Sequence, residues 1–229
     1  MSRVLLIGHG YDAPFPDRVR LFLQAQGRAY DEIAPCNGDA LPESFDDIAA
    51  VVIYGGAQEI YQTDLYPYLA DEHAFTRRLV AADIPVLGLC LGAQCIAYAH
   101  GAEVTTRSDS AYEFGYYDVT PTEAGHDFLP DGPARMPQWH WHYAALPEGA
   151  ELLAHSELFP TQAFRLGSAY GFQFHPEVTP EIMRFWQDLD GAPYGRPGSQ
   201  TRDEQDRHLA EQDARIDRWF NAFLTEFFA

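Results

Sequence analysis

Lysine is absent from this chain of 229 residues, so all 15 of its strongly basic side chains are arginines. This absence excludes two kinds of chemistry, because a Schiff base with pyridoxal phosphate and the phosphate-binding P-loop each require a lysine. Positive charge is also scarce, since 34 acidic side chains give a formal net charge of −19. Phosphate backbones and anionic lipid repel such a chain, so nucleic acid and membrane surfaces are poor partners.

Cysteine is scarce too. The chain has an odd number of cysteines, namely Cys36, Cys90 and Cys95, and no two of them form a C-x-x-C motif. A disulfide framework or a zinc site is therefore not expected, and we expect no metal and no cofactor. No apolar run approaches the roughly 18 residues of a membrane-spanning helix, and the run at residues 4–7 is too short for a signal peptide. We therefore expect a cytoplasmic protein.

The first hundred residues alternate two apolar patterns. Short runs typical of buried strands lie at residues 4–7, 50–54 and 86–89. Apolar residues spaced as on one face of a helix occur at residues 18–26, 65–82 and 91–100. Strands that alternate with helices predict βαβ units and a parallel sheet. After residue 102 the apolar runs are short, and few of their residues have the spacing of a helix. This pattern predicts antiparallel strands at 102–107, 114–121, 150–156, 162–167 and 169–177.

The C-terminal part is expected to be helical. Thr179 followed by Pro180 is a typical helix start, which predicts a helix over 179–189. A Gly/Pro-rich connection follows at 191–198. The apolar stripe of a final helix consists of Ile216, Trp219, Phe220, Phe223, Leu224 and Phe227. We expect one domain at residues 1–190, with a connecting loop and C-terminal helix at 191–229 packed on it.

The sequence "GLCLG" at residues 88–92 lies between an expected strand and an expected helix. Its G-x-C-x-G pattern is the sulfur form of the nucleophile elbow, a strained turn that exposes a reactive side chain. Glycines suit such a turn because a close strand–helix approach leaves no room for a Cβ. The helix N-terminus beside Cys90 carries partial positive charge, which stabilises a thiolate. Cys90 is a candidate nucleophile, and a buried structural cysteine is the alternative.

A candidate base lies in "GFQFHPE", residues 171–177. His175 ends a strand pattern, since Pro176 disfavours further strand pairing. Alternate residues of an extended chain point the same way, so His175 and Glu177 would lie side by side. Cys90, His175 and Glu177 would then follow the logic of a catalytic triad. The alternative is a hydrogen-bonded histidine at a strand end.

An attacked carbonyl also needs donors for its developing oxyanion. Gly55 and Gly56 follow the strand at 50–54 and could turn a backbone N–H toward the cysteine. The N–H of Leu91 would be the second donor of this oxyanion hole. An ordinary strand-to-loop turn is the alternative.

The segments "YGG", "GLCLGAQ" and "FQFHPE" occur in this order along the chain. In this respect the sequence resembles class I glutamine amidotransferases, especially stand-alone members similar to the amidotransferase domain of GMP synthase. The resemblance extends from the first strand to the H-P-E segment. It implies an α/β fold with a flavodoxin-like parallel sheet, helices on both faces and a small antiparallel elaboration.

The resemblance also implies the chemistry. Cys90 would attack the γ-carboxamide of glutamine, and His175 would pass the thiol proton to the leaving ammonia. Glu177 would hold His175, and the N–H groups of Gly56 and Leu91 would hold the oxyanion. Water would then hydrolyse the thioester to glutamate.

The expected substrate-binding residues are Gln94, Gly55, His140 and Gly115, the last from a family-like "YEFG" segment. One departure affects this side of the site. Family members often carry H-G-D before an L-P pair, whereas this chain has "WHWHYAALP" at 139–147. Counting back from the L-P pair aligns His140 with the family histidine and puts His142 in place of the aspartate. An aromatic pocket wall or a protein-facing surface is expected there, and a metal site is the less favoured alternative.

Three functions stay open at this point. The chain could be a glutaminase that supplies a separate synthase, or a stand-alone γ-glutamyl hydrolase or peptidase. The same triad serves both, and only the pocket around the leaving group distinguishes them. The third is a redox or stress protein of similar fold with Cys90 as its sensor, although a sensor thiol needs no H-P-E segment. The expected partners are glutamine or another γ-glutamyl compound, and either a synthase or a second copy of the chain.

Overall fold

The computed structural model describes residues 2–10 and 13–229. The strands are β1 (Arg3–Ile7), β2 (Tyr30–Ile33), β3 (Ile48–Ile53), β4 (Val86–Leu89), β5 (Val104–Thr106), β6 (Glu113–Pro121), β7 (Ala134–His140), β8 (His142–Ala144), β9 (Glu151–His155), β10 (Ala163–Leu166) and β11 (Ala169–Phe172). The helices are α1 (Arg18–Ala25), α2 (Tyr68–Ala81), α3 (Leu91–Ala99), α4 (Pro180–Gln187) and α5 (Arg202–Phe227), with a short 3-10 turn at Pro35–Asn37.

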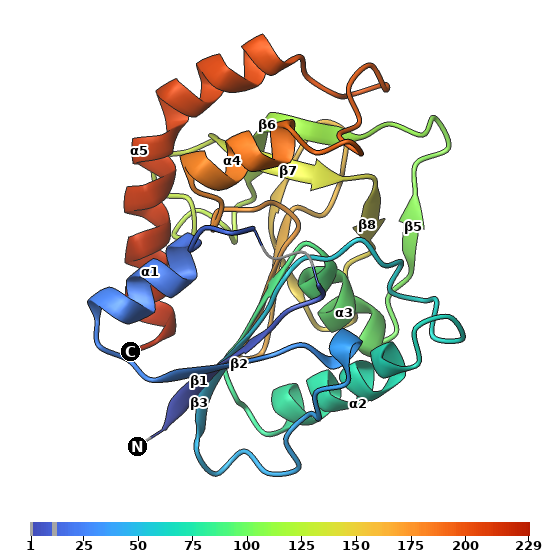
Figure 1. Ribbon diagram of the computed structural model, residues 1–229, viewed down its shortest axis with the longest axis vertical. Coiled ribbons are helices and arrows are strands. Elements are labelled where there is room, and N and C mark those ends of the chain that lie inside the picture. Colours follow the sequence, from blue (N-terminus) through green and yellow to red (C-terminus); the bar gives the residue numbers. More distant parts are fainter. Residues whose placement is uncertain (1, 11–12) are drawn as a thin grey trace.

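The parallel half of the main sheet has the order β2-β1-β3-β4-β11, and every neighbouring pair in it is parallel. Helices α2 and α3 cover one face, and α1, α4 and α5 cover the other (Figure 1). The predicted flavodoxin-like α/β fold is therefore confirmed.

Burial on both faces explains the continuous apolar runs of the central strands. In β1, Val4 and Leu6 belong to the core under α1 and α5, whereas Leu5 and Ile7 belong to the core under α2 and α3. A strand covered on both sides needs apolar residues at consecutive positions rather than at alternate ones. The carboxyl ends of these strands lie together at one end of the sheet, and the cysteine turn lies at this end.

Beyond β11, the strands β10, β9, β6 and β7 continue the same sheet in antiparallel pairing, and β5 pairs separately with β8. Strands are present at all five positions predicted after residue 102. β5, β6, β9 and β10 pair antiparallel with their neighbouring strands, whereas β11 pairs antiparallel with β10 but parallel with β4, so the prediction of an antiparallel strand at 169–177 is right on one side only. Three strands were not predicted, and one of them, β8, is only three residues long. β2 is an edge strand whose Asp31 and Glu32 are exposed, and β7 contains Pro137, which is tolerated because β7 is the opposite edge.

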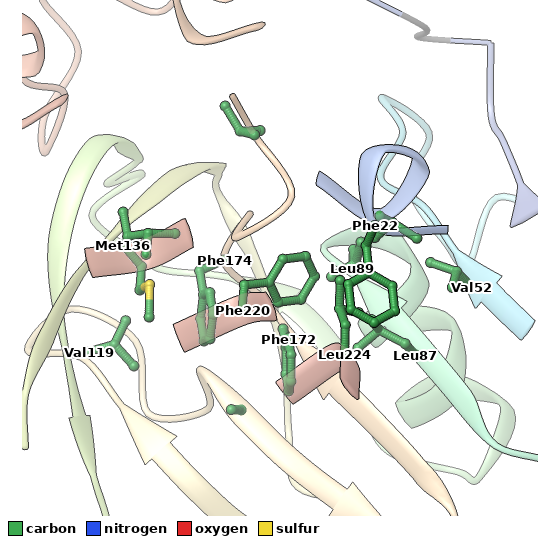
Figure 2. Close-up of a cluster of buried hydrophobic side chains, with 14 of the residues drawn as sticks. Phe22, Val52, Leu87, Leu89, Val119, Met136, Phe172, Phe174, Phe220 and Leu224 are labelled. Carbon is green, nitrogen blue, oxygen red and sulfur yellow. The ribbon is translucent and has the colours of Figure 1, made fainter. Parts of the chain in front are cut away.

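Helix α5 packs against the sheet. Its buried side chains include Leu209, Ile216, Phe220 and Leu224, and they share one core with α1 and the central strands. Figure 2 shows Phe220 and Leu224 beside Phe172 and the β4 leucines. Thr201 and Glu204 form a capping box at the helix start, so the helix begins earlier than the apolar stripe alone indicates. Among the helices described here, none combines the length and the apolar character needed to cross a membrane.

Candidate active site

Cys90 lies where β4 ends and α3 begins. Its backbone has φ 52° and ψ −104°, a conformation that residues other than glycine rarely adopt. The Cys90 N–H donates to the carbonyl oxygen of Phe172 on β11 at 2.7 Å, and Sγ lies 3.9 Å from the carbonyl oxygen of Trp139. This is the strained strand-to-helix turn that the G-x-C-x-G pattern predicts.

The two glycines of the pattern are required by close backbone approach. A Cβ on Gly92 would lie 2.0 Å from the carbonyl oxygen of Ile53 on β3, and a Cβ on Gly88 would lie 2.5 Å from the carbonyl group of Gly92. Both contacts are with main chain, which cannot rotate aside as a flexible side chain can. The prediction that a Cβ has no room at these positions is confirmed.

His175 and Glu177 meet as predicted, with Nδ1 of the histidine 2.7 Å from Oε1 of the carboxylate. The reason differs from the one expected. Strand β11 ends at Phe172, and both residues lie in the turn beyond it rather than in extended chain. The His175 N–H donates to the carbonyl oxygen of Pro137 on β7 at 2.8 Å, and the Val178 N–H donates to the carbonyl oxygen of His175 at 3.3 Å. The turn therefore brings the two side chains together.

His175 is buried between two acidic groups. Burial lowers the pKa of His175, but the negative charges of Glu177 and Cys90 and the hydrogen bonds to both outweigh burial and raise the pKa to about 10. The ring of Trp186 stands edge-on to the imidazole, with ring centroids 4.9 Å apart. His175 therefore holds its proton at neutral pH, between the sulfur and the carboxylate.

The glycine pair after β3 lies beside the cysteine turn. A Cβ on Gly55 would lie 3.1 Å from Cε1 of His175 and 3.5 Å from Cβ of Cys90. A Cβ on Gly56 would lie 2.7 Å from Cδ2 of Leu91. Since β3 and β4 are neighbours in the sheet, the two candidate oxyanion donors lie on adjacent elements at the same end of the sheet as the sulfur.

A buried ion pair that the sequence analysis did not identify supports this glycine pair. Nε2 of His9 lies 3.0 Å from Oε1 of Glu72, and neither side chain is exposed. Burial lowers the pKa of His9, but the charge and hydrogen bond of Glu72 raise it above the ordinary value of histidine. A Cβ on Gly56 would lie 2.7 Å from Cβ of His9, so the pair packs directly against the candidate oxyanion donor.

Two glutamines extend the site from the sulfur. Nε2 of Gln173 donates to Sγ of Cys90 at 3.5 Å, and Nε2 of Gln94 donates to Oε1 of Gln173 at 3.2 Å. Both side chains are buried. Gln94 was predicted as a substrate-binding residue, whereas Gln173 was not predicted. Its signal in the sequence is a polar residue between Phe172 and Phe174 in a buried segment.

His140 belongs to a buried polar network. Its Nε2 lies 3.0 Å from Oε2 of Glu113, and its Nδ1 lies 2.9 Å from the carbonyl oxygen of His142. The carboxylate of Glu113 also accepts hydrogen bonds from Ser156 at 2.7 Å and from Gln162 at 2.6 Å. Both ring nitrogens of His140 are bonded within the protein, and its contact with substrate stays a prediction.

Gly115 lies opposite Gln138 in the β6–β7 pair, at a φ of +132°. A Cβ there would lie 2.4 Å from Oε1 of Gln200, in the segment that precedes α5. None of these contacts is with Cys90, Gln94 or Gln173, so the role of Gly115 in substrate binding stays a prediction.

The side chain of His142 has other partners, although its carbonyl oxygen accepts from His140. Its Nε2 lies 3.1 Å from the hydroxyl of Tyr61, in the loop after β3. His140 and His142 therefore have different partners. Within residues 2–10 and 13–229, no group of three or more His, Cys, Asp or Glu side chains could hold a metal ion.

The chain matches the model of the class-I glutamine amidotransferase family over residues 25–184. The match covers most of the chain and includes Cys90, His175 and Glu177. The flavodoxin-like sheet and the strained cysteine turn agree with it. This protein belongs to the class-I glutamine amidotransferase family.

Individual relatives agree with that assignment. The chain is 36% identical over 155 residues to a glutamine amidotransferase-like protein of Salmonella typhimurium, which is 64% of each chain. It is 36% identical over 181 residues to a GMP synthase of Aeropyrum pernix, which is 74% of this chain and 33% of that enzyme. The chain thus spans less than two thirds of the first protein and about a third of the second.

Two crystal structures share the fold over nearly the full length. A glutamine amidotransferase from Thermotoga maritima has a TM-score of 0.86 at 25% identity, with 99% of this chain and 98% of that one covered. A glutamine amidotransferase from Methylobacillus flagellatus has a TM-score of 0.84 at 26% identity, with coverages of 96% and 91%. The likeness therefore includes the C-terminal helix, which lies outside the family match.

Proposed function

We propose that this protein hydrolyses the γ-carboxamide of glutamine through a γ-glutamyl thioester on Cys90 and supplies the ammonia to an acceptor. The observation that carries the proposal is the meeting of three features at one end of the sheet. These are the strained Cys90, the protonated His175 with its Glu177 carboxylate, and the glycine pair beside Leu91. Family membership supports glutamine as the amide donor.

In the first half of the reaction, the thiolate of Cys90 bonds to the γ-carbonyl carbon. The carbonyl electron pair moves onto oxygen, where the N–H groups of Gly56 and Leu91 hold the negative charge. Loss of one such donor costs about 3–4 kcal/mol in transition-state stabilisation. His175 gives its proton to the amide nitrogen as the carbon–nitrogen bond breaks and ammonia leaves, and Glu177 stabilises the imidazole.

In the second half, neutral His175 takes a proton from water while the water oxygen bonds to the thioester carbon. The carbon–sulfur bond breaks, glutamate leaves, and Cys90 returns to the thiolate beside a protonated imidazole. Gln173 orients the sulfur, and Gln94 and Gly55 form the substrate side of the site.

The test is glutamate release from L-glutamine by the purified protein. Cys90→Ala removes the nucleophile, so we expect a loss of at least about a thousandfold. Cys95→Ala is the matched control, because Cys95 is a fully buried cysteine on the same turn–helix segment that contacts Thr76 rather than the triad. Glutamate release that survives Cys90→Ala would contradict the proposal.

A γ-glutamyl dipeptide assayed in parallel distinguishes the other functions. Rapid cleavage of the dipeptide with little release from glutamine would replace the proposal with a γ-glutamyl hydrolase. Reversible oxidation of Cys90 with no release from either substrate would favour a redox sensor. Whether the ammonia acceptor is a separate synthase, and whether the chain acts as a homodimer, are proposals that co-purification and light scattering address.

A further inference from the structure

Arg18, the first residue of α1, is buried beneath the turn that carries the catalytic pair. Only 4% of it is exposed. Its Nη1 donates to the carbonyl oxygen of Pro176 at 3.1 Å and also to that of Val178. Its backbone N–H donates to the carbonyl oxygen of Glu177 at 2.8 Å. A single residue therefore binds three consecutive carbonyl groups, with the catalytic carboxylate on the middle residue.

The remaining donors of the same guanidinium point to α5. Nε donates to Oδ1 of Asp217 at 3.1 Å, and Nη2 donates to Oδ1 of Asp213. The planar fork of arginine suits this arrangement, because it directs several donors at fixed angles, which the point charge of a lysine does not. Arg18 therefore bridges the C-terminal helix and the H-P-E turn.

The turn needs such a restraint. Glu177 contacts His175 through Oε1, whereas its Oε2 is buried and has no hydrogen-bond partner among the described residues. The bonds of Arg18 to the carbonyl groups on both sides of Glu177, and to that of Glu177 itself, restrain the turn that holds this unpartnered carboxylate oxygen.

We propose that Arg18 is a positioning residue that fastens the H-P-E turn to α5, so that docking of the C-terminal helix sets the contact between Glu177 and His175. Where it is tested by activity, this inference rests on the proposed glutamine hydrolysis. Helix α5 lies outside the family match, and the proposal gives this helix a second role in addition to covering the core.

The first test leaves Arg18 in place and changes its helix partners. The double variant Asp213→Asn/Asp217→Asn removes two carboxylates that are partly exposed, so the fold is expected to survive. The matched control is Asp203→Asn/Glu226→Gln, which removes the same charge from exposed positions near the two ends of α5. The two substitutions of this control lie near opposite ends of α5, so their effects on the interaction with the helix dipole have opposite signs and offset each other. Arg18→Gln and Arg18→Lys complete the set.

For the α5 double variant we expect kcat for glutamine to fall about tenfold with KM nearly unchanged, because small misplacement of a catalytic group slows chemistry more than binding. The alkaline limb of the pH profile should move to lower pH, since Glu177 no longer holds the proton on His175. Arg18→Gln should have a larger effect, and Arg18→Lys should restore only part of the activity. Reduced melting temperature with an unchanged pH profile and kcat would overturn the proposal, as would equal effects in the control.

Hydrogen exchange decides the matter without a substrate. The amides of Arg18 and Val178 donate two of the backbone bonds that hold the turn, and the amide of His175 donates a third to Pro137. The amides of Arg18 and Val178 should exchange faster in the α5 double variant than in the control. Equal exchange overturns the positioning role, whether or not the wild-type protein hydrolyses glutamine. Faster exchange in a protein that releases no glutamate would leave the role of Arg18 standing and reject the proposed activity instead.

Discussion

At the residue scale, the protonation of His175 determines how the site would act. Because the pKa of His175 is raised to about 10, its imidazole is charged at neutral pH and faces Cys90 as an acid. The sulfur therefore has a positively charged neighbour, and this imidazole carries the proton that the proposed reaction would transfer to the leaving ammonia. The carboxylate of Glu177 maintains this state from the opposite side of the ring.

This arrangement predicts an alkaline limit to activity. The kcat/KM for glutamine should persist through neutral pH and fall near pH 10, where the imidazole loses the proton that ammonia requires. Glu177→Gln removes a negative charge that raises this pKa, so the fall should move to lower pH by about one to three units. Full pH profiles of both proteins check the prediction.

Glu181→Gln is the matched control, because Glu181 is an exposed acid four residues further along the chain. Its profile should coincide with that of the wild type. An alkaline limb at the same pH in Glu177→Gln and wild type would mean that the carboxylate does not set the proton affinity of His175.

At the scale of secondary-structure elements, the contact of α3 with the sheet generates the reactive turn. The start of α3 passes so close to β3 that position 92 has no room for a side chain. Cys90 is the single residue between β4 and α3, and its backbone takes up the strain of the turn as a positive φ. The backbone bond from Cys90 to β11 and the turn after β11 then place sulfur and imidazole together.

Gly92→Ala should therefore be strongly destabilising. Its Cβ would lie 2.0 Å from a main-chain oxygen, so α3 must move away from β3. We expect a loss of about 3 kcal/mol, the upper part of the range for overpacking, and a melting temperature lower by roughly 6–12 °C. Thermal unfolding followed by circular dichroism measures it. At Gly191 no atom lies within 4 Å of an added Cβ, so Gly191→Ala is the control, and equal melting temperatures for the two variants would refute the packing argument.

At the scale of the whole molecule, helix α1 near the N-terminus and helices α4 and α5 near the C-terminus share one core with the sheet. Residues of α1, α4 and α5 pack together over β1, β3, β4 and β11. Figure 2 shows part of this core, with Phe22 of α1 near Leu224 of α5. The stacked rings of Phe172 and Phe174 connect this core to the H-P-E turn, with centroids 5.2 Å apart. The core that stabilises the fold therefore also supports the pair of His175 and Glu177.

Phe220→Ala tests how far the C-terminal helix contributes to that stability. Phe220 is fully buried, and removal of its ring should cost about 3–5 kcal/mol. Urea unfolding measures the free energy of unfolding directly. Phe15→Ala is the control. Because Phe15 is 42% exposed, this substitution should change the free energy of unfolding by less than about 0.5 kcal/mol. A similar small change for Phe220→Ala would mean that α5 is not part of the cooperative unit.

The sequence predicted the elements whose signals are local. Continuous apolar runs identified β1, β3 and β4, and the glycines around Cys90 identified the turn. Edge strand β7 was missed because Pro137 interrupts its pattern and the edge position that tolerates proline is a property of the sheet. The pairing of His175 with Glu177 was predicted for an extended chain, whereas a turn held by β7 produces it. Arg18 could not be found at all, since its partner Pro176 lies 158 residues away.

The most direct test of the proposed chemistry is to trap the covalent intermediate. The protein would be mixed with glutamine, quenched in acid within its turnover time, digested and examined by mass spectrometry. We predict one glutamyl group, labile to hydroxylamine, on the peptide that contains Cys90, and none on Cys36 or Cys95. Glutamate release with no adduct on Cys90, or with the adduct on another cysteine, would contradict the assignment of Cys90 as the nucleophile.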